Sequence, residues 1–146
     1  MKAMNLVAKA NTTINADSKI VWDALTNPGI IKQYMFNTTV VSDWKEGSSI
    51  IWKGEWKGKP YEDKGMIIKL EPGRLLQYTH FSPMTGQPDI PENYHTATIE
   101  LENKNGQTQL SLSQDKNNSE EERQHSEENW KMMLEQMKKV IEQKPH

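Results

Sequence analysis

The sequence predicts an α+β fold in which helices pack on one face of an antiparallel sheet. Two observations support this prediction. Residues 49–114 contain short strand-like segments joined by turn signals, and the last third contains one long amphipathic helix. Two shorter helical segments follow the first strand near the start. Strands and helices therefore come in separate runs rather than in alternation, which favours an α+β fold.

The first third is expected to hold a strand, two helical segments and a second strand. Residues 6–13 predict the first strand, and residues 17–26 predict a helix that Asp17 and Ser18 begin. The apolar residues of this helix share one face: Ile20, Val21, Ala24 and Leu25. Asn27-Pro28-Gly29 ends it, residues 30–34 predict one or two further helical turns, and residues 36–41 predict a strand.

The middle of the chain predicts an antiparallel sheet. Its strands are expected at residues 49–56, 61–70, 75–82, 94–102 and 107–114. Asn105-Gly106 between the last two is the strongest hairpin signal in the chain. The proline-rich segment 83–93 is interpreted either as a gate over a cavity mouth or as a simple connection.

The long helix is predicted from Ser119 to about Gln143. Ser119 and Glu122 form the S-x-x-E pattern of a capping box. One apolar stripe follows at helical spacing: Trp130, Met133, Leu134, Met137 and Ile141. This stripe is expected to pack along a curved sheet, so any ligand would lie between the two.

Composition sets limits on the class of protein. The 146 residues suit one domain, residues 1–146, and the net charge of −2 with interspersed charges argues against a nucleic-acid partner or an anionic membrane. The absence of cysteine excludes disulfides and thiol chemistry. No signal peptide or stretch of about 20 apolar residues is evident, so we expect a cytoplasmic protein without membrane insertion.

Large aromatic side chains predict a cavity between sheet and helix. Its walls are expected to be Trp52, Trp56, Tyr78, Ala97, Trp130, Met133, Leu134 and Met137, with His80 and His95 at a polar end. Its mouth is expected at Tyr34, Phe36, Trp44 and Met84. The alternative is that the same aromatics simply fill the core.

His80 and His95 form the second candidate feature. A register that pairs Tyr78 with Ala97 also places His80 opposite His95, and it puts the apolar residues of both strands on one face. The pair is interpreted as a polar anchor or an acid/base pair for a ligand, or as two rim histidines bonded to water, and no carboxylate partner is evident. A zinc site would need a third ligand such as His125, and no metal site is predicted.

The acidic residues are expected to form solvated surfaces. On the long helix these are Glu120, Glu121, Glu122, Glu127 and Glu128; Glu62 and Asp63 are interpreted in the same way. Motifs for nucleotide binding, metalloprotease chemistry or a serine nucleophile are absent, so no catalytic residue and no cofactor are predicted.

Several local strings together resemble the START-like, Bet v-type (SRPBCC) superfamily. They resemble most its branch named for the activator of the heat-shock protein 90 ATPase, in a small single-domain form. The strings are residues 20–28 (IVWDALTNP), 52–56 (WKGEW), 64–68 (KGMII), Glu71-Pro72, 75–79 (LLQYT) and 129–131 (NWK), followed by Leu134. The resemblance implies a helix-grip fold, in which a curved antiparallel sheet wraps around the C-terminal helix with a cavity between them.

These features lead to one expected function and two alternatives. We expect non-enzymatic binding of a small hydrophobic or amphipathic molecule, such as a lipid, by a monomer or weak dimer. The resemblance supplies the first alternative, a stress-related, co-chaperone-like module with a protein partner or chaperone. The second is a cyclase or dehydratase that uses His80 and His95.

Overall fold

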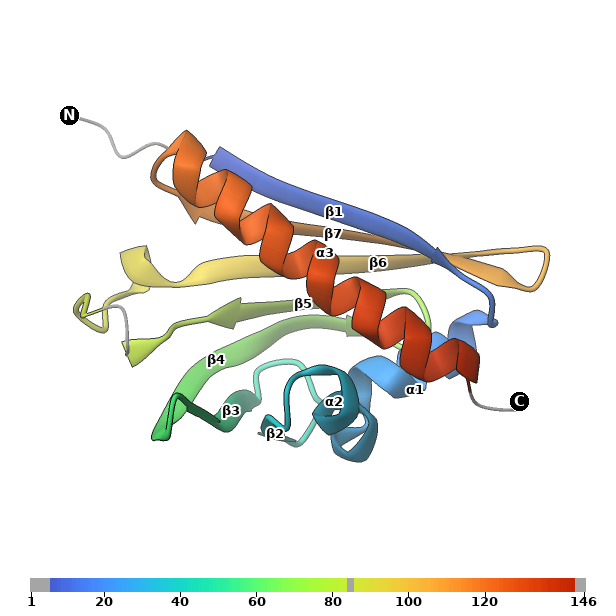
Figure 1. Ribbon diagram of the computed structural model, residues 1–146, viewed down its shortest axis with the longest axis horizontal. Coiled ribbons are helices and arrows are strands. Elements are labelled where there is room, and N and C mark those ends of the chain that lie inside the picture. The colour runs from blue at the N-terminus through green and yellow to red at the C-terminus, as the bar shows by residue number, and fades with distance from the viewer. Residues whose placement is uncertain (1–5, 84–85, 144–146) are drawn as a thin grey trace.

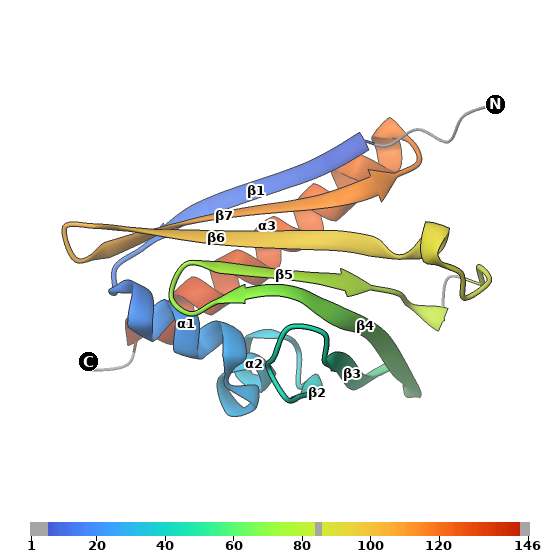
Figure 2. The ribbon, with the colours of Figure 1, turned by 180° about the vertical axis from the view of Figure 1, so that it is seen from behind.

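The computed structural model describes residues 6–83 and 86–143 and has the predicted α+β helix-grip architecture (Figure 1). Seven strands form one antiparallel sheet in the order β1-β7-β6-β5-β4-β3-β2. The strands are β1 (Leu6–Ile14), β2 (Thr39–Ser42), β3 (Ser49–Trp56), β4 (Lys59–Glu71), β5 (Leu75–His80), β6 (His95–Lys104) and β7 (Gln107–Asn117). The helices are α1 (Ser18–Thr26), α2 (Pro28–Tyr34) and α3 (Glu120–Gln143), with a short 3-10 helix at Pro91–Asn93. In Figure 2 the other face of the sheet is in front and α3 lies behind it.

Helices α1 and α2 begin and end where the sequence places the capping residues. The Asp17 carboxylate accepts hydrogen bonds from the backbone N–H groups of Lys19 and Ile20 at the start of α1. Asn27 ends α1 and caps α2 by accepting from the N–H of Gly29. The predicted strand at residues 36–41 was placed too early, because Phe36 and Asn37 adopt positive φ angles of 52° and 65° in the turn that ends α2. The strand therefore begins at Thr39.

Helix α3 lies along the concave face of the sheet and runs beside β1 (Figure 1). Its predicted stripe is buried at Met133, Leu134, Met137 and Ile141, while Trp130 is half-buried. Ser119 accepts a hydrogen bond from the N–H of Glu122, as the capping box predicts, but the Glu122 carboxylate accepts from Asn118 rather than from Ser119. Strand β7 continues to Asn117, three residues beyond the predicted end at residue 114.

Two glutamates of α3 bind the backbone of the edge strand and the turn that follows it. The Glu127 carboxylate accepts from the N–H of Lys9 at 3.0 Å, and Glu142 accepts from the N–H of Asn15 at 2.8 Å. Glu127 also pairs with Arg123, and its side chain is only 20% exposed. The prediction that Glu127 belongs to a merely solvated face was therefore wrong, because unpaired N–H groups at this edge need an acceptor.

The register between β5 and β6 is the predicted one. Tyr78 pairs with Ala97, Leu76 with Ile99 and His80 with His95.

Close contact between β4 and β5 requires a glycine at position 65, because a Cβ atom there would lie 1.7 Å from the carbonyl oxygen of Thr79. A register shift follows in the same strand pair between Ile67 and Lys69. Such irregularities bend a strand, which fits the curvature of the sheet around α3.

The core lies between the concave face of the sheet and the three helices. Its fully buried side chains include Ile14, Val21, Ile67, Leu110, Leu134 and Met137. Among the described residues, no helix is long and apolar enough to cross a membrane.

Candidate functional site

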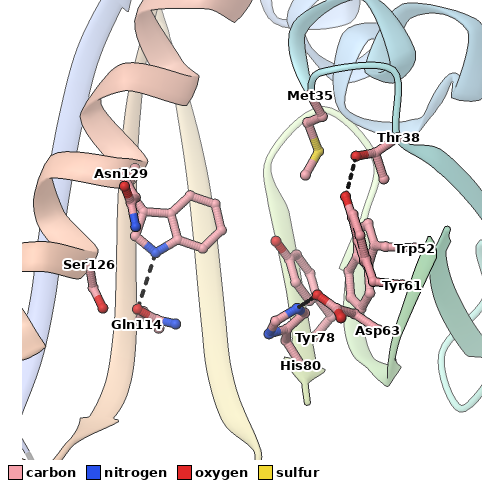
Figure 3. Close-up of a pocket in the computed structure, with 11 residues that line it drawn as sticks. Met35, Thr38, Trp52, Tyr61, Asp63, Tyr78, His80, Gln114, Ser126 and Asn129 are labelled. Carbon is pink, nitrogen blue, oxygen red and sulfur yellow. Dashed lines mark hydrogen bonds and ion pairs between the residues drawn. The ribbon is translucent and has the colours of Figure 1, made fainter. Parts of the chain in front are cut away.

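A cavity of about 230 Å³ lies between the first half of α3 and strands β3, β4 and β5 (Figure 3). The sheet side supplies Trp52, Tyr61, Asp63, Tyr78 and His80. The other sides are formed by Met35, Thr38, Gln114, Ser126, Asn129 and Trp130. The walls are mainly aromatic, with polar groups at a few points, which is the usual composition of a small-molecule site.

Strand alternation explains the sheet wall. Trp52 pairs with Asp63 across β3 and β4, and Gly54 pairs with Tyr61, so all four residues share the concave face. The Trp52 and Tyr78 rings lie 5.4 Å apart between centroids at an angle of 48°, a tilted aromatic pair. Burial raises the pKa of Tyr78, so its hydroxyl stays protonated and can donate a hydrogen bond.

Asp63 and His80 form a hydrogen-bonded pair in this wall. Nε2 of His80 lies 2.8 Å from Oδ2 of Asp63, and the Asp63 side chain is only 15% exposed. The His80 ring also meets Trp52 edge to face, with 4.9 Å between centroids. The other carboxylate oxygen, Oδ1 of Asp63, is buried and has no hydrogen-bond partner within the described residues. Asp63 was predicted to be a solvated surface charge, and this prediction was wrong.

Tyr61 lies flat over the neighbouring strand because position 54 has no side chain. A Cβ atom at Gly54 would lie 2.5 Å from the Tyr61 hydroxyl oxygen. That hydroxyl and the Thr38 hydroxyl are 2.8 Å apart and share a hydrogen bond. Gly54 therefore makes room for an aromatic side chain that would otherwise have to point away from this wall.

The opposite wall is carried by α3 and the end of β7. The indole N–H of Trp130 donates to the side-chain oxygen of Gln114 at 3.2 Å. The Ser126 hydroxyl donates to the side-chain oxygen of the buried Asn117, which ties the start of α3 to β7. In Figure 3, Ser126 and Asn129 face the Asp63–His80 pair across the cavity.

A second, much smaller cavity of about 30 Å³ adjoins the first, and Met35, Trp52 and Tyr78 line both. Its other lining residues include Tyr34, Trp44 and Met133. A volume of about 30 Å³ is roughly what one molecule occupies in liquid water. Side chains therefore fill most of the space in this region. Tyr34 contributes to that filling, since its hydroxyl donates to the carbonyl of Ala24 at 2.9 Å.

The structure brings only some of the predicted site residues to the larger cavity. Trp52, Tyr78, His80 and Trp130 line it. Met133, Tyr34 and Trp44 lie at the small cavity, while Ala97, Leu134 and Met137 are buried in the core. Phe36 is 67% exposed and lines neither cavity, so its placement at the mouth was wrong. Met84 lies outside the described residues, and so does the side chain of Trp56.

His80 and His95 are register neighbours but have different partners. Nδ1 of His95 lies 2.8 Å from the backbone carbonyl of Asp115, and His95 does not line the larger cavity. The carboxylate partner of His80 was missed in the sequence. Within residues 6–83 and 86–143 there is no group of three side chains that could hold a metal ion.

Seven residues of the cavity were not predicted from the sequence: Met35, Thr38, Tyr61, Asp63, Gln114, Ser126 and Asn129. Tyr61 and Asp63 could have been found by applying alternation through the β3–β4 turn, which puts them on the face of Trp52. The positions of the other five residues depend on where α2 and α3 cross the sheet, which a local sequence pattern does not predict.

The segment 83–93 does not cover this cavity in the part that is described. Asp89, Pro91 and Tyr94 instead line an open groove of about 570 Å³ on the outer face of the sheet, together with Lys64, Met66 and Lys116. The hydrogen bonds from Lys64 and Tyr94 hold the pKa of Asp89 below its usual value and fix the segment there. Of the two interpretations of this segment, its described residues therefore fit a connection and not a gate over the cavity mouth.

Comparisons with known proteins agree with this architecture. The pattern of the family described as activator of Hsp90 ATPase homolog 1-like protein matches residues 15–142. The solution structure of ChR145 from Cytophaga hutchinsonii is 57% identical, with 98% of this chain and 97% of that chain covered and a TM-score of 0.86. A comparison with curated proteins gives no significant match.

More distant structures share the fold alone. The solution structure of the Aha1 dimer from Colwellia psychrerythraea is 18% identical, covers 93% of this chain and 96% of that chain, and has a TM-score of 0.73. The crystal structure of Ara h 8.0201 is 11% identical, covers 97% and 100%, and has a TM-score of 0.76.

Proposed function

The chain belongs to the family of activator of Hsp90 ATPase homolog 1-like proteins, and we propose that it binds a small amphipathic molecule in the cavity between α3 and strands β3–β5. The observation that supports this proposal most directly is the 230 Å³ cavity, which has aromatic walls and a part-buried Asp63–His80 pair on one side. The fold belongs to a superfamily of ligand-binding and interaction domains, and it leaves the ligand open.

The size of the cavity limits the ligand. An apolar protein cavity of about 150 Å³ binds benzene, and drug-sized ligands occupy roughly 300–1,000 Å³. A space of 230 Å³ therefore suits a compact molecule of one or two rings. A long acyl chain does not fit without movement of Met35, which lines both cavities, or of Met133, which lines the small one.

A titration of the protein with compact aromatic probes, followed by NMR, tests this function. The indole N–H of Trp130 bonds Gln114 in the cavity wall, whereas Trp22 lines neither of the two inner cavities. Binding in the cavity is expected to shift the indole signals of Trp52 and Trp130 and to leave that of Trp22 in place. The same probes should raise the melting temperature by mass action. Failure of a broad panel of one- and two-ring probes to do either would falsify the proposal.

A second candidate function is a protein-interaction module, and exposed apolar side chains support it. Val41, Met66 and Ile68 are 51%, 48% and 39% exposed on β2 and β4. Val41 and Met66 lie on the convex face, opposite the cavity. The family description refers to activation of a chaperone ATPase. The alternative is tested by measuring ATP turnover of an Hsp90-type chaperone with this chain and with a Met66→Lys variant. A protein-interaction module of this kind should stimulate turnover, and the variant should not.

A further inference from the structure

We propose that the cavity selects a neutral hydroxylated aromatic molecule whose O–H group donates a hydrogen bond to Nδ1 of His80, which Asp63 holds in the acceptor tautomer. This inference rests on the proposed function and specifies the ligand of the same site. It assigns His80 as a binding residue and Asp63 as a positioning residue.

The tautomer follows from the partner of Nε2. An ionised carboxylate only accepts hydrogen bonds, so the contact of 2.8 Å between Oδ2 of Asp63 and Nε2 of His80 places the ring proton on Nε2. In the neutral imidazole, Nδ1 then carries a lone pair and no proton. Nδ1 makes no hydrogen bond with any described residue, and it lies on the side of the ring away from Asp63 (Figure 3).

Within the described part of the chain, the Asp63 carboxylate has no evident task other than its contact with His80. Oδ1 of Asp63 has no partner among the described residues, although a buried carboxylate oxygen without a hydrogen bond is costly. Among the residues that the structure describes, this side chain has one hydrogen-bond partner, His80. The Asp63 carboxylate lowers stability and contacts one imidazole, so its role is best explained by its effect on the tautomer of His80.

The surrounding groups favour a hydroxyl over other headgroups. An ammonium only donates hydrogen bonds, so it cannot accept the one that the protonated hydroxyl of Tyr78 offers, whereas a hydroxyl can both donate and accept. A carboxylate would bring a second negative charge next to Asp63. A hydroxyl donates one hydrogen bond, and the aromatic ring that carries it can pack against Trp52 and Trp130. The protonated hydroxyl of Tyr78 supplies a donor for a further oxygen of the ligand.

Three bicyclic probes of nearly the same shape test the inference: naphthalene, 2-naphthol and 2-methoxynaphthalene. Dissociation constants are measured by calorimetry at pH 7.5 for the natural protein, for Asp63→Asn and for Glu62→Gln. Glu62 is the matched control, since it is adjacent in β4, exposed, and on the other face of the sheet. The imidazole tautomer of His80 is read from its ¹⁵N chemical shifts.

The natural protein is expected to bind 2-naphthol about tenfold more tightly than either other probe, the effect of one good hydrogen bond. Its ¹⁵N shifts should show a proton on Nε2. In Asp63→Asn the amide can donate to Nε2, which moves the proton to Nδ1, so the preference for 2-naphthol over 2-methoxynaphthalene should fall about tenfold. Glu62→Gln should keep both the preference and the tautomer.

Different results separate this inference from the proposed function. If naphthalene binds in the cavity and 2-naphthol binds no more tightly, the inference is wrong and the binding function stands. The same conclusion follows if the natural protein carries its imidazole proton on Nδ1, a measurement that needs no variant to fold. If no probe binds, both are contradicted.

Discussion

Trp52 and Asp63 face each other across strands β3 and β4, and this pairing brings a carboxylate that is only 15% exposed into an aromatic wall. Asp63 reaches His80 from there, and the His80 ring returns to Trp52 at 4.9 Å. The three side chains therefore form one unit, in which the position of the imidazole is fixed by a carboxylate on one side and an indole on the other. The predictions below concern this unit and the elements that hold it.

Filling the cavity should abolish binding without unfolding the protein. Asn129 is exposed and lines the cavity from α3, so Asn129→Phe places a ring in the space that a ligand would use. We expect an unchanged or higher melting temperature and a loss of 2-naphthol affinity of at least tenfold. Calorimetry measures the affinity. Glu128→Phe, at the adjacent exposed position that does not line the cavity, should bind as the natural protein does.

The two histidines of the register pair should differ in their effect on binding. His80 lines the cavity, whereas His95 bonds the carbonyl of Asp115 and does not line it. His80→Ala is therefore expected to weaken 2-naphthol binding about tenfold, the loss of one hydrogen bond. His95→Ala should change binding less than twofold and mainly lower the melting temperature. Equal effects of both substitutions on affinity would show that the pair acts as a unit, against this account.

Gly65 and Gly54 should respond very differently to alanine. At Gly65 a Cβ would meet the backbone oxygen of Thr79, which cannot move without separating β4 from β5. Gly65→Ala is expected to destabilise by about 3 kcal/mol or more. At Gly54 the clash is with the side chain of Tyr61, which can turn away at the cost of its bond to Thr38. Urea denaturation of both variants measures the difference, and similar losses would contradict it.

Glu127 should make stability depend on pH on the acid side. The hydrogen bond from the Lys9 N–H, followed by the pairing with Arg123, lowers the pKa of Glu127 from its usual 4.5. A lowered pKa in the folded state gives stability that is present above the usual value and is lost as pH falls through the folded value. Glu127→Gln should therefore lower the melting temperature by about 3 °C at pH 7, with a smaller difference below pH 4.

The control for this prediction is Glu128→Gln. Glu128 is exposed, and no hydrogen bond or ion pair of its side chain is found among the described residues. Its melting curve should match that of the natural protein across the same pH range. If the difference between Glu127→Gln and the natural protein stays constant down to pH 3, the assignment of the acid dependence to Glu127 is wrong.

Much of the fold follows from local sequence patterns. The hairpin at Asn105-Gly106 forms because both residues tolerate the positive φ angles of 54° and 81° that the turn requires. The register of β5 and β6 follows from the requirement that Leu76, Tyr78, Ala97 and Ile99 share the buried face. The stripe of α3 follows from helical periodicity.

The site is less accessible to such reasoning, because its parts come from different elements. Strand alternation places Asp63 on the same face as Trp52, but a charged residue between Glu62 and Lys64 resembles an ordinary surface position. Asp63 and His80 lie 17 residues apart on the neighbouring strands β4 and β5, and their contact depends on how these two strands are aligned. Phe36 fails for a different reason: the turn that ends α2 directs it to solvent.

The central claim is that a compact hydroxylated aromatic molecule binds between Trp52, Tyr78 and Trp130. Intermolecular nuclear Overhauser effects between 2-naphthol and the protein test it most directly, because the inner cavity and the larger outer groove have no lining residue in common. This account predicts contacts from the probe to Trp52, Tyr78 and Trp130. Contacts to Met66 and Tyr94 instead would place the ligand in the outer groove and contradict it.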